Sequence, residues 1–416
     1  MELSYNLRYQ KFSFSGRLLI DKEGEVIIYA KGFRIKGKGA SDKGELINFS
    51  EIKEFFYKDE KIIFITFTKE KYILSDTGTL FDQLLIDIYK SRNEFLMDAL
   101  FMRTGKLKAE FDCNFERSSK FGKLINKARA KIRLYEQSMI VIPEIQDAFA
   151  IYFDFVNFHE FDELDYFLKI VIDDGTTIII SQLGQDYELF EEKMNELLGG
   201  MYETIVNEGL KQIFDEFHSA TLLKLACIMK EGKAVQLKEI QKMDKELAVA
   251  VENYIYQDKN FAEKVKVLRD ICDEKNIFYG IARDLAVKGG FIKWVLFTIP
   301  EKNIVAFSVL PRWKEIPLDL HDTYFYKIIM EQGNPMEKVI DKVREIEQAL
   351  VVLNFAKDPC YKDKRDLRHS PYQYAIRKMP FLRILRKSYI GKIGAKEVKE
   401  WQSQAKEILS RAVLSH

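Results

Sequence analysis

Hydrophobic and polar residues alternate in short runs over the first part of the chain, a spacing typical of β-strands with one buried face. Such runs occupy 18–20, 26–29, 33–35, 47–57, 61–68 and 71–75. Helical spacing follows, because Leu80, Leu84, Leu85 and Ile88 fall on one face of a helix. We therefore predict a unit from about residue 11 to residue 102, made of several strands and one terminal helix.

A second unit, from about residue 113 to residue 218, shows the same order. Strands are predicted at 129–135, 139–142, 148–153, 156–166, 167–173 and 176–181, and a helix from Tyr187. The segments 47–57 and 156–166 also match residue by residue at a separation of 109, with identical Asn, Phe, Tyr and both Glu. After a three-residue contraction Gly78 aligns with Gly184 and Phe81 with Tyr187. These matches indicate an internal duplication of about a hundred residues.

The matched segments, INFSEI at 47–52 and VNFHEF at 156–161, resemble the strand that ends in the aromatic-x-x-Ile element of bacterial PH-like domains. A small antiparallel domain that ends in one helix also resembles the pleckstrin-homology-like superfold. The resemblance covers about half of the chain. It implies two near-orthogonal sheets that form a partly open barrel, with the helix at one end.

The expected fold class is α+β, with two consecutive PH-like partly open β-barrels, each closed by a C-terminal helix. We place the first PH-like domain at 1–105 and the acidic second one at 106–217. The remaining pattern predicts a helical segment at 218–275, an α+β domain or divergent third PH-like unit at 276–356, and a basic helical tail at 357–416. A chain of 416 residues is long enough for several such domains.

Charge is unevenly distributed, although the formal net charge is only +1. Residues 144–216 contain 18 acidic and three basic side chains, whereas residues 357–399 contain 13 basic and four acidic ones. The acidic region is either a solvated surface, a dock for the basic tail of the same chain, or a site for a basic protein partner. Tandem PH-like domains of histone chaperones suggest the last alternative by architecture alone. The partner candidates are Glu160, Asp162, Glu163, Asp165, Glu188, Glu191 and Glu192.

Two basic clusters are candidates for binding anions. Lys31, Arg34, Lys36 and Lys38 surround a predicted hairpin. In many membrane-binding PH domains such residues bind inositol phosphates, but a solubilising, lysine-protected sheet edge is the favoured explanation. The tail candidates are Arg377, Lys378, Arg383, Arg386 and Lys387. They suit nucleic acid, an anionic surface, an acidic protein face, or plain packing against the preceding strands.

Motifs of enzyme chemistry are absent from the sequence: it has no HExxH, Gly-x-Ser-x-Gly, Walker A or dinucleotide-binding pattern. We predict neither a cofactor nor a metal site. The four cysteines form no CxxC pair and suggest reduced, mostly buried thiols. The chain shows neither a secretory signal nor a transmembrane segment, so a cytoplasmic location is expected.

The sequence favours a noncatalytic binding or scaffolding protein that uses PH-like surfaces, an acidic second domain and a basic tail. A protein partner or self-association is expected, nucleic acid through the tail is an alternative, and a lipid headgroup fits less well because the acidic domain would repel an anionic membrane. An enzyme with an unfamiliar pocket is the other alternative, and it would show a deep cleft with strongly shifted titratable groups.

Overall fold

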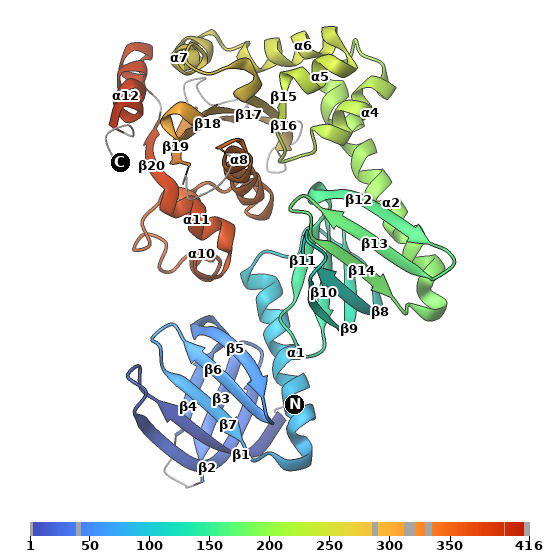
Figure 1. The fold of residues 1–416 in the computed structure, drawn as a ribbon, viewed down its shortest axis with the longest axis vertical. Coiled ribbons are helices and arrows are strands. Elements are labelled where there is room, and N and C mark those ends of the chain that lie inside the picture. The colour runs from blue at the N-terminus through green and yellow to red at the C-terminus, as the bar shows by residue number, and fades with distance from the viewer. Residues whose placement is uncertain are drawn as a thin grey trace. The chain divides into compact units, whose positions relative to one another are not determined.

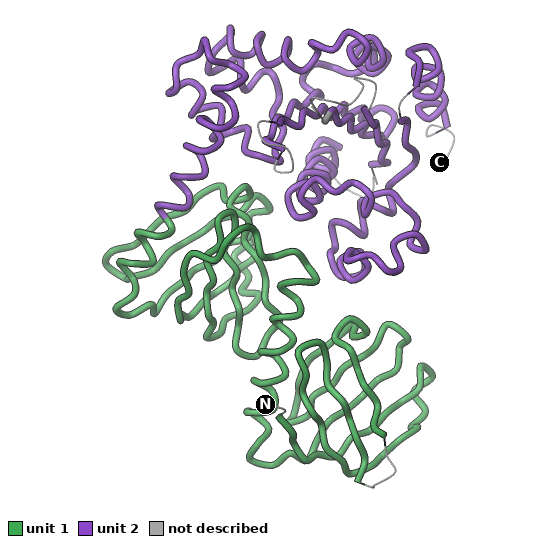
Figure 2. Tube along the Cα trace, turned by 180° about the vertical axis from the view of Figure 1, so that it is seen from behind, with its two compact units in different colours: residues 1–194 green, residues 195–416 purple. Residues whose placement is uncertain are grey.

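The computed structural model describes residues 3–38, 43–284, 290–311, 321–328, 335–394 and 396–411. The chain divides into two compact units, 1–194 and 195–416 (Figure 2). Its architecture is mixed helix and sheet, with two curled antiparallel sheets followed by a third sheet that is covered by helices (Figure 1). Among the described residues no helix combines the length and apolar character needed to cross a membrane.

The first sheet has the strand order β4-β3-β2-β1-β7-β6-β5 and is antiparallel throughout. Alternation of buried and exposed residues along its strands places one face in a core with Phe33, Phe64 and Tyr72. The helix α1 then packs Leu84, Leu85 and Ile88 into this core, as its spacing predicts. The strands are β1 (Leu3–Phe12), β2 (Leu18–Tyr29), β3 (Gly32–Gly37), β4 (Glu45–Asn48), β5 (Ile52–Lys58), β6 (Lys61–Thr66) and β7 (Lys71–Ser75), followed by α1 (Phe81–Ala99).

The second sheet repeats this order as β11-β10-β9-β8-β14-β13-β12. A short 3₁₀ helix follows the edge strand in both sheets, at Phe49–Glu51 and Phe153–Phe155. The closing helix has 19 residues in each case. The elements are β8 (Leu107–Ser118), β9 (Leu124–Tyr135), β10 (Ser138–Pro143), β11 (Phe149–Tyr152), β12 (Val156–Asp162), β13 (Phe167–Ile172), β14 (Thr177–Ser181) and α2 (Tyr187–Ile205). Shared strand order and shared interruptions support the duplication.

The residue-by-residue match that first suggested the duplication is nevertheless out of register. Most equivalent elements lie 106 residues apart, since β2 begins at Leu18 and β9 at Leu124. The separation falls to 104 at the 3₁₀ helix, so Phe49 corresponds to Phe153 and not to Phe158. Burial agrees, because Phe49 and Phe153 are both fully buried whereas Phe158 is 47% exposed. The loop between β10 and β11 is shorter than its counterpart, and the turn between β12 and β13 is longer, which restores the separation of 106.

The two sheets of the first unit are joined through buried polar residues on α1. Asn93 is 1% exposed, and its amide nitrogen donates to the carbonyl oxygens of Pro143 (3.2 Å) and Gln146 (3.0 Å). Its amide oxygen accepts from the backbone nitrogen of Ala148 at 2.9 Å. The fully buried guanidinium of Arg92 forms a two-pronged ion pair with Asp147. Helix α1 therefore packs into the core of the first sheet and also holds the β10–β11 loop of the second through hydrogen bonds and an ion pair.

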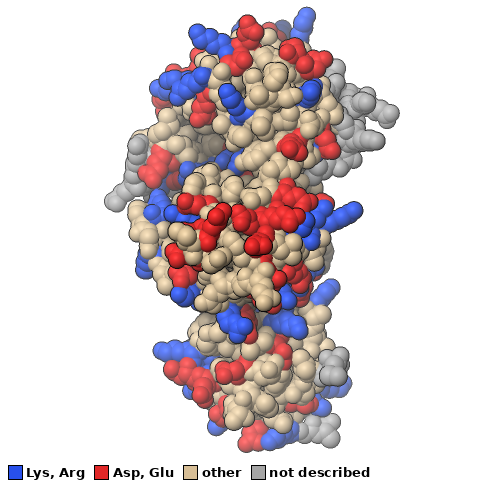
Figure 3. Space-filling model, turned by 90° about the vertical axis from the view of Figure 1, so that its right-hand side faces the viewer, with Lys and Arg blue, Asp and Glu red and all other residues tan. Residues whose placement is uncertain are grey.

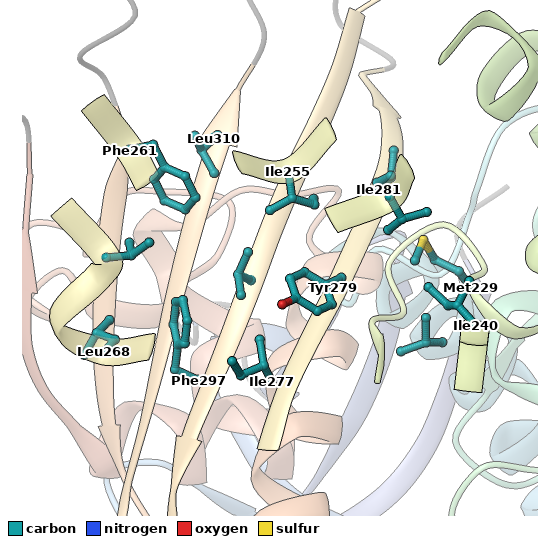
Figure 4. Close-up of a cluster of buried hydrophobic side chains, with 14 of the residues drawn as sticks. Met229, Ile240, Ile255, Phe261, Leu268, Ile277, Tyr279, Ile281, Phe297 and Leu310 are labelled. Atoms are coloured by element: carbon teal, nitrogen blue, oxygen red, sulfur yellow. The ribbon is translucent and has the colours of Figure 1, made fainter. Parts of the chain in front are cut away.

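The second unit is built on a six-stranded antiparallel sheet with the order β15-β16-β17-β18-β19-β20. Helices cover both faces of it, with α5, α6 and α7 on one side and α8, α10 and α11 on the other (Figure 1). Figure 4 shows the core between the sheet and the helices α5, α6 and α7, where Ile255 of α6 and Phe261 of α7 lie over Phe297 and Tyr279 of the sheet. The strands are β15 (Val235–Gln236), β16 (Ile277–Asp284), β17 (Gly290–Ile299), β18 (Ile304–Pro311), β19 (Asp322–Lys327) and β20 (Tyr389–Ile393).

The helices of the second unit come from three parts of the sequence. Helices α3 to α7 precede β16 and lie mainly where a helical segment was predicted. Helices α8 to α11 lie between β19 and β20, and α12 follows β20. Their bounds are α3 (Lys211–Ile213), α4 (Ser219–Ile228), α5 (Leu237–Met243), α6 (Lys245–Tyr256), α7 (Lys259–Arg269), α8 (Pro335–Val352), α9 (Asp358–Tyr361), α10 (Gln373–Lys378), α11 (Pro380–Ser388) and α12 (Val398–Arg411).

Two features of this unit differ from the sequence-based expectation. Its strands lie side by side in the order in which they occur along the chain. In each N-terminal sheet, by contrast, the first strand lies next to the last one, so strand order does not support a third copy of the repeat. The described part of the basic segment 357–416 is not wholly helical, because β20 pairs with β19 along Thr323–Tyr326. Its α12 packs on α7, which agrees with packing against the preceding region, one of the alternatives that the sequence left open. The sequence pattern missed β20 because a strand of five residues in basic surroundings carries little periodic signal. The other proposed domain boundaries remain predictions.

Candidate binding surfaces

The predicted acidic partner site lies on the β12–β13 hairpin and the first turns of α2. The hairpin turn is fixed by the carboxylate of Asp162, which accepts from the backbone nitrogens of Leu164 and Asp165, both at 2.9 Å. The hydroxyl of Tyr187, the first residue of α2, donates to the carbonyl oxygen of Asp162 at 3.0 Å. These bonds hold the hairpin against the start of the helix, so acidic residues distant in sequence become neighbours.

The pKa of the Tyr187 hydroxyl reflects the nearness of these carboxylates. Burial raises the pKa of its hydroxyl, and the negative charges of Glu191, Glu163 and Asp162 raise it further. The ring of Tyr166 lies edge-on to the ring of Tyr187, with centroids 5.3 Å apart. Carboxylates of the hairpin and of the helix therefore surround one aromatic cluster.

Exposed hydrophobic side chains lie among these acids. Leu164 is 90% exposed and Tyr166 is 61% exposed, and both belong to the hairpin turn. Phe158 and Leu189 are each exposed to nearly half of their full area. Figure 3 shows Asp and Glu side chains gathered on the face of the second sheet and α2. We define the acidic–aromatic patch as the seven predicted acids with these four side chains: Glu160, Asp162, Glu163, Asp165, Glu188, Glu191, Glu192, Phe158, Leu164, Tyr166 and Leu189.

Few cations neutralise the patch within the parts of the chain that the structure describes. The contact of Glu192 with Lys193, at 3.9 Å, is long and joins sequence neighbours. Of the seven predicted acids, Asp162, Glu163 and Glu191 thus lie close to the Tyr187 hydroxyl, and the other four lie on the same hairpin and helix. It assigns Asp162 a structural part in the turn, which the sequence did not reveal. The exposed apolar side chains among the acids were also missed, since exposure is decided by the fold.

The basic cluster of the first domain is largely paired. Lys38 forms an ion pair with Glu23 at 2.6 Å, and Lys36 approaches Glu25 at 3.9 Å across the β2–β3 ladder. The guanidinium of Arg34 lies 5.9 Å from the ring centre of Tyr29. Lys31 is exposed in the turn between the two strands. Cross-strand pairing accounts for most of this cluster, which favours the explanation of a charged, protected sheet surface.

The predicted tail residues separate into different environments. Arg386 donates to the carbonyl oxygens of Pro359 and Lys362, both at 2.6 Å, and burial lowers the pKa of its guanidinium. It therefore stabilises the local fold. Arg383 and Lys387 are exposed on α11, and the ammonium of Lys378 lies 5.9 Å from the ring centre of Tyr374.

Arg377 alone among the predicted tail cations lines a surface hollow, of about 240 Å³. Its companions there, Lys364, Arg365 and Arg368, were not predicted. They lie on a turn whose position relative to α10 could not be inferred from spacing.

Two features that an enzyme would need, a hollow and a shifted titratable group, occur together in the first unit. A hollow of about 530 Å³ in the first unit lies between α1 and strands β8–β10, and is lined by Lys90, Arg129 and Glu144 among others. Burial raises the pKa of the Cys113 thiol, which lines this hollow, to about 12. Shifted groups also occur in the second unit. There burial raises the pKa of Tyr324 and lowers the pKa of Lys357, beside a void of only about 10 Å³.

Within the described residues no group of three or more His, Cys, Asp or Glu side chains is arranged to hold a metal ion. No known protein family and no curated protein matches the sequence. The chain's own residues therefore carry the functional assignment.

Proposed function

We propose that this protein is a noncatalytic binding protein with tandem PH-like domains, and that the acidic–aromatic patch of the second domain binds a basic segment of a partner protein. Two seven-stranded curled sheets, each followed by a 19-residue helix, support the PH-like assignment. Seven carboxylates on one hairpin and the first turns of one helix, with exposed hydrophobic side chains on the same elements, support the binding role. Four free cysteines suit a reducing compartment such as the cytoplasm.

The charge and the apolar side chains of the patch indicate which kind of partner segment it would bind. A surface rich in carboxylates raises the rate of encounter with a Lys- or Arg-rich segment and repels nucleic acid or an anionic membrane. Leu164 and Tyr166 supply the apolar contact area that charge alone lacks, since aromatic and apolar anchors carry much of the binding energy at interfaces. The expected partner segment therefore combines basic residues with one or two apolar side chains.

A peptide array with fluorescence-anisotropy follow-up tests this proposal. The full chain is titrated with Lys/Arg-rich peptides that contain an apolar residue, and with peptides of equal length in which Lys and Arg are replaced by Gln. The patch variant is Glu160→Gln, Glu163→Gln and Glu191→Gln, which leaves the structural Asp162 intact. Each exposed ion pair contributes at most a few-fold, so we expect binding to weaken between about 3-fold and about 100-fold.

A matched control removes three exposed charges elsewhere: Glu60→Gln, Asp82→Asn and Glu203→Gln. Affinity should also fall as salt rises from about 50 to about 300 mM, because salt screens exposed charges. The proposal fails if the control weakens binding as much as the patch variant, or if the neutral peptides bind equally well. If the basic residues of 357–399 cover the patch in the same chain, high salt should change the hydrodynamic radius without any peptide.

A further inference from the structure

A second, oppositely charged site lies in the other unit. The hollow of about 240 Å³ is lined by Lys364, Arg365, Arg368 and Arg377, together with Gln373. Its remaining lining, Leu367 and Ile376, is buried and apolar. Among the described residues, four cations and no carboxylate line this hollow. It belongs to neither the acidic–aromatic patch nor the paired cluster of the first domain.

The local fold holds these cations in place. Arg386 of α11 donates to the carbonyl oxygens of Pro359 and Lys362, which anchors the start of the turn segment 362–372. The hydroxyl of Ser370 donates to the carbonyl oxygen of Leu367 at 2.8 Å, which closes its far end. Gln373 and Arg377 then follow at i and i+4 on α10, so they face the same side of that helix. The turn and the helix together bring separated cations to one opening.

The nearby carboxylate of Asp358 has partners of its own. Asp358 accepts from Lys362 at 2.6 Å and from Tyr361 at 2.9 Å. Asp363 and Asp366 alternate with the lining residues but do not line the hollow themselves. In the described parts of the chain no carboxylate forms an ion pair with Lys364, Arg365 or Arg368. Cations held this close repel one another, and a multivalent anion would relieve that repulsion.

We propose that this hollow binds the di- or triphosphate group of a small ligand. Guanidinium groups match phosphate oxygens with paired hydrogen bonds, and Gln373 offers a neutral donor beside them. The hollow of about 240 Å³ leaves room for two or three linked phosphates. None of the described residues that line the hollow is aromatic, so they offer no stacking platform of the kind found in single-stranded nucleic-acid sites.

Isothermal titration of the full chain with pyrophosphate, tripolyphosphate and ATP tests the proposal. The variant Arg365→Gln and Arg368→Gln should weaken tripolyphosphate binding at least about 10-fold, because each charge-assisted hydrogen bond is worth roughly that much. The control Arg383→Gln and Lys387→Gln removes two exposed cations of α11 outside the hollow and should leave affinity within about 2-fold. Circular dichroism and the Tm of both variants should equal those of the parent.

Comparison of the inorganic phosphates with ATP shows whether the hollow recognises the phosphate groups alone or a nucleotide. Equal affinity for tripolyphosphate and ATP assigns recognition to the phosphates alone, whereas tighter ATP binding shows added contact with the nucleoside. The proposal is overturned if none of these ligands binds, if the control weakens binding as much as the hollow variant, or if a single-stranded oligonucleotide binds through Arg365 and Arg368 while tripolyphosphate does not. This site and its test are independent of the acidic–aromatic patch.

Discussion

Replacement of Asn93 by alanine should loosen the junction between the two N-terminal sheets. The side chain is 1% exposed and makes three hydrogen bonds to the loop between β10 and β11, with Pro143, Gln146 and Ala148. Alanine removes all three and leaves two carbonyl oxygens and one backbone nitrogen without this partner. At a net contribution of about 1 kcal/mol each, the loop should lose about 3 kcal/mol of local stability.

Hydrogen exchange followed by mass spectrometry measures this loss where it occurs. A chain with two compact units need not unfold in one step, so a single Tm would mix several transitions. Local exchange reports each segment separately. A loss of about 3 kcal/mol should accelerate exchange in residues 143–148 by roughly 100-fold, and the neighbouring turns of α1 should follow.

The control is Gln83→Ala, an exposed position on the same helix that should change exchange by less than 2-fold. Position 199 in the second repeat, which corresponds to Asn93, is a glycine within α2 and offers no such anchor. Acceleration below about 5-fold in residues 143–148 would refute the reasoning, because it would mean that water or backbone shifts replace the lost bonds.

Further predictions concern the cores and the thiols. Phe64→Ala should cost about 3–5 kcal/mol in the first domain, measured by urea unfolding, because the fully buried ring stacks on Tyr72 at 4.7 Å; a cost below 1 kcal/mol would contradict this packing. Gly280→Ala should lower the Tm of the second unit, since an added Cβ would lie 2.0 Å from the Trp294 ring; an unchanged Tm would show that the ring can move. A thiol reagent at pH 8 should modify one cysteine rapidly, the exposed Cys227, and two or more fast thiols would be inconsistent with the fold. Burial raises the pKa of the other three thiols to about 12, so their contribution to stability should be present below pH 9 and decline as pH rises from 9 towards 12: Cys113, Cys272 and Cys360.

Strand and helix positions of the N-terminal half followed from periodicity, with two informative omissions. The first strand of each sheet, β1 and β8, was largely left out of the predicted units. Period-two alternation was nevertheless present there, since Tyr5, Leu7 and Tyr9 are all buried along β1. The run 47–57 was predicted as one strand, but a 3₁₀ helix divides it. Its local polar bonds, from Asn48 to Glu51, compete with the ladder in a way that hydrophobic spacing does not register.

The candidate sites were predictable only in part, because local sequence patterns do not show which distant segments will meet. Local acidic composition was sufficient to nominate the carboxylates of the patch, because they lie in two short segments, and their role in binding stays a prediction. The hollow in the second unit was not predictable, because it requires a turn and a helix to approach through bonds made by Arg386. Arg386 itself was predicted as a binding residue and instead stabilises the fold. The sequence shows that a residue is charged, but it does not show whether backbone carbonyl groups will bind that side chain in the folded protein.

By itself the sequence determined the alternation of strands, the closing helices and the existence of two similar halves, since these depend on periods of two and 3.6 residues within one element. The tertiary structure decided which residues correspond between the halves, because burial distinguishes Phe153 from Phe158 where residue type does not. It also decided that Tyr389–Ile393 completes a sheet begun more than a hundred residues earlier. Such pairing depends on backbone hydrogen bonds between distant segments, which are nearly independent of side-chain identity.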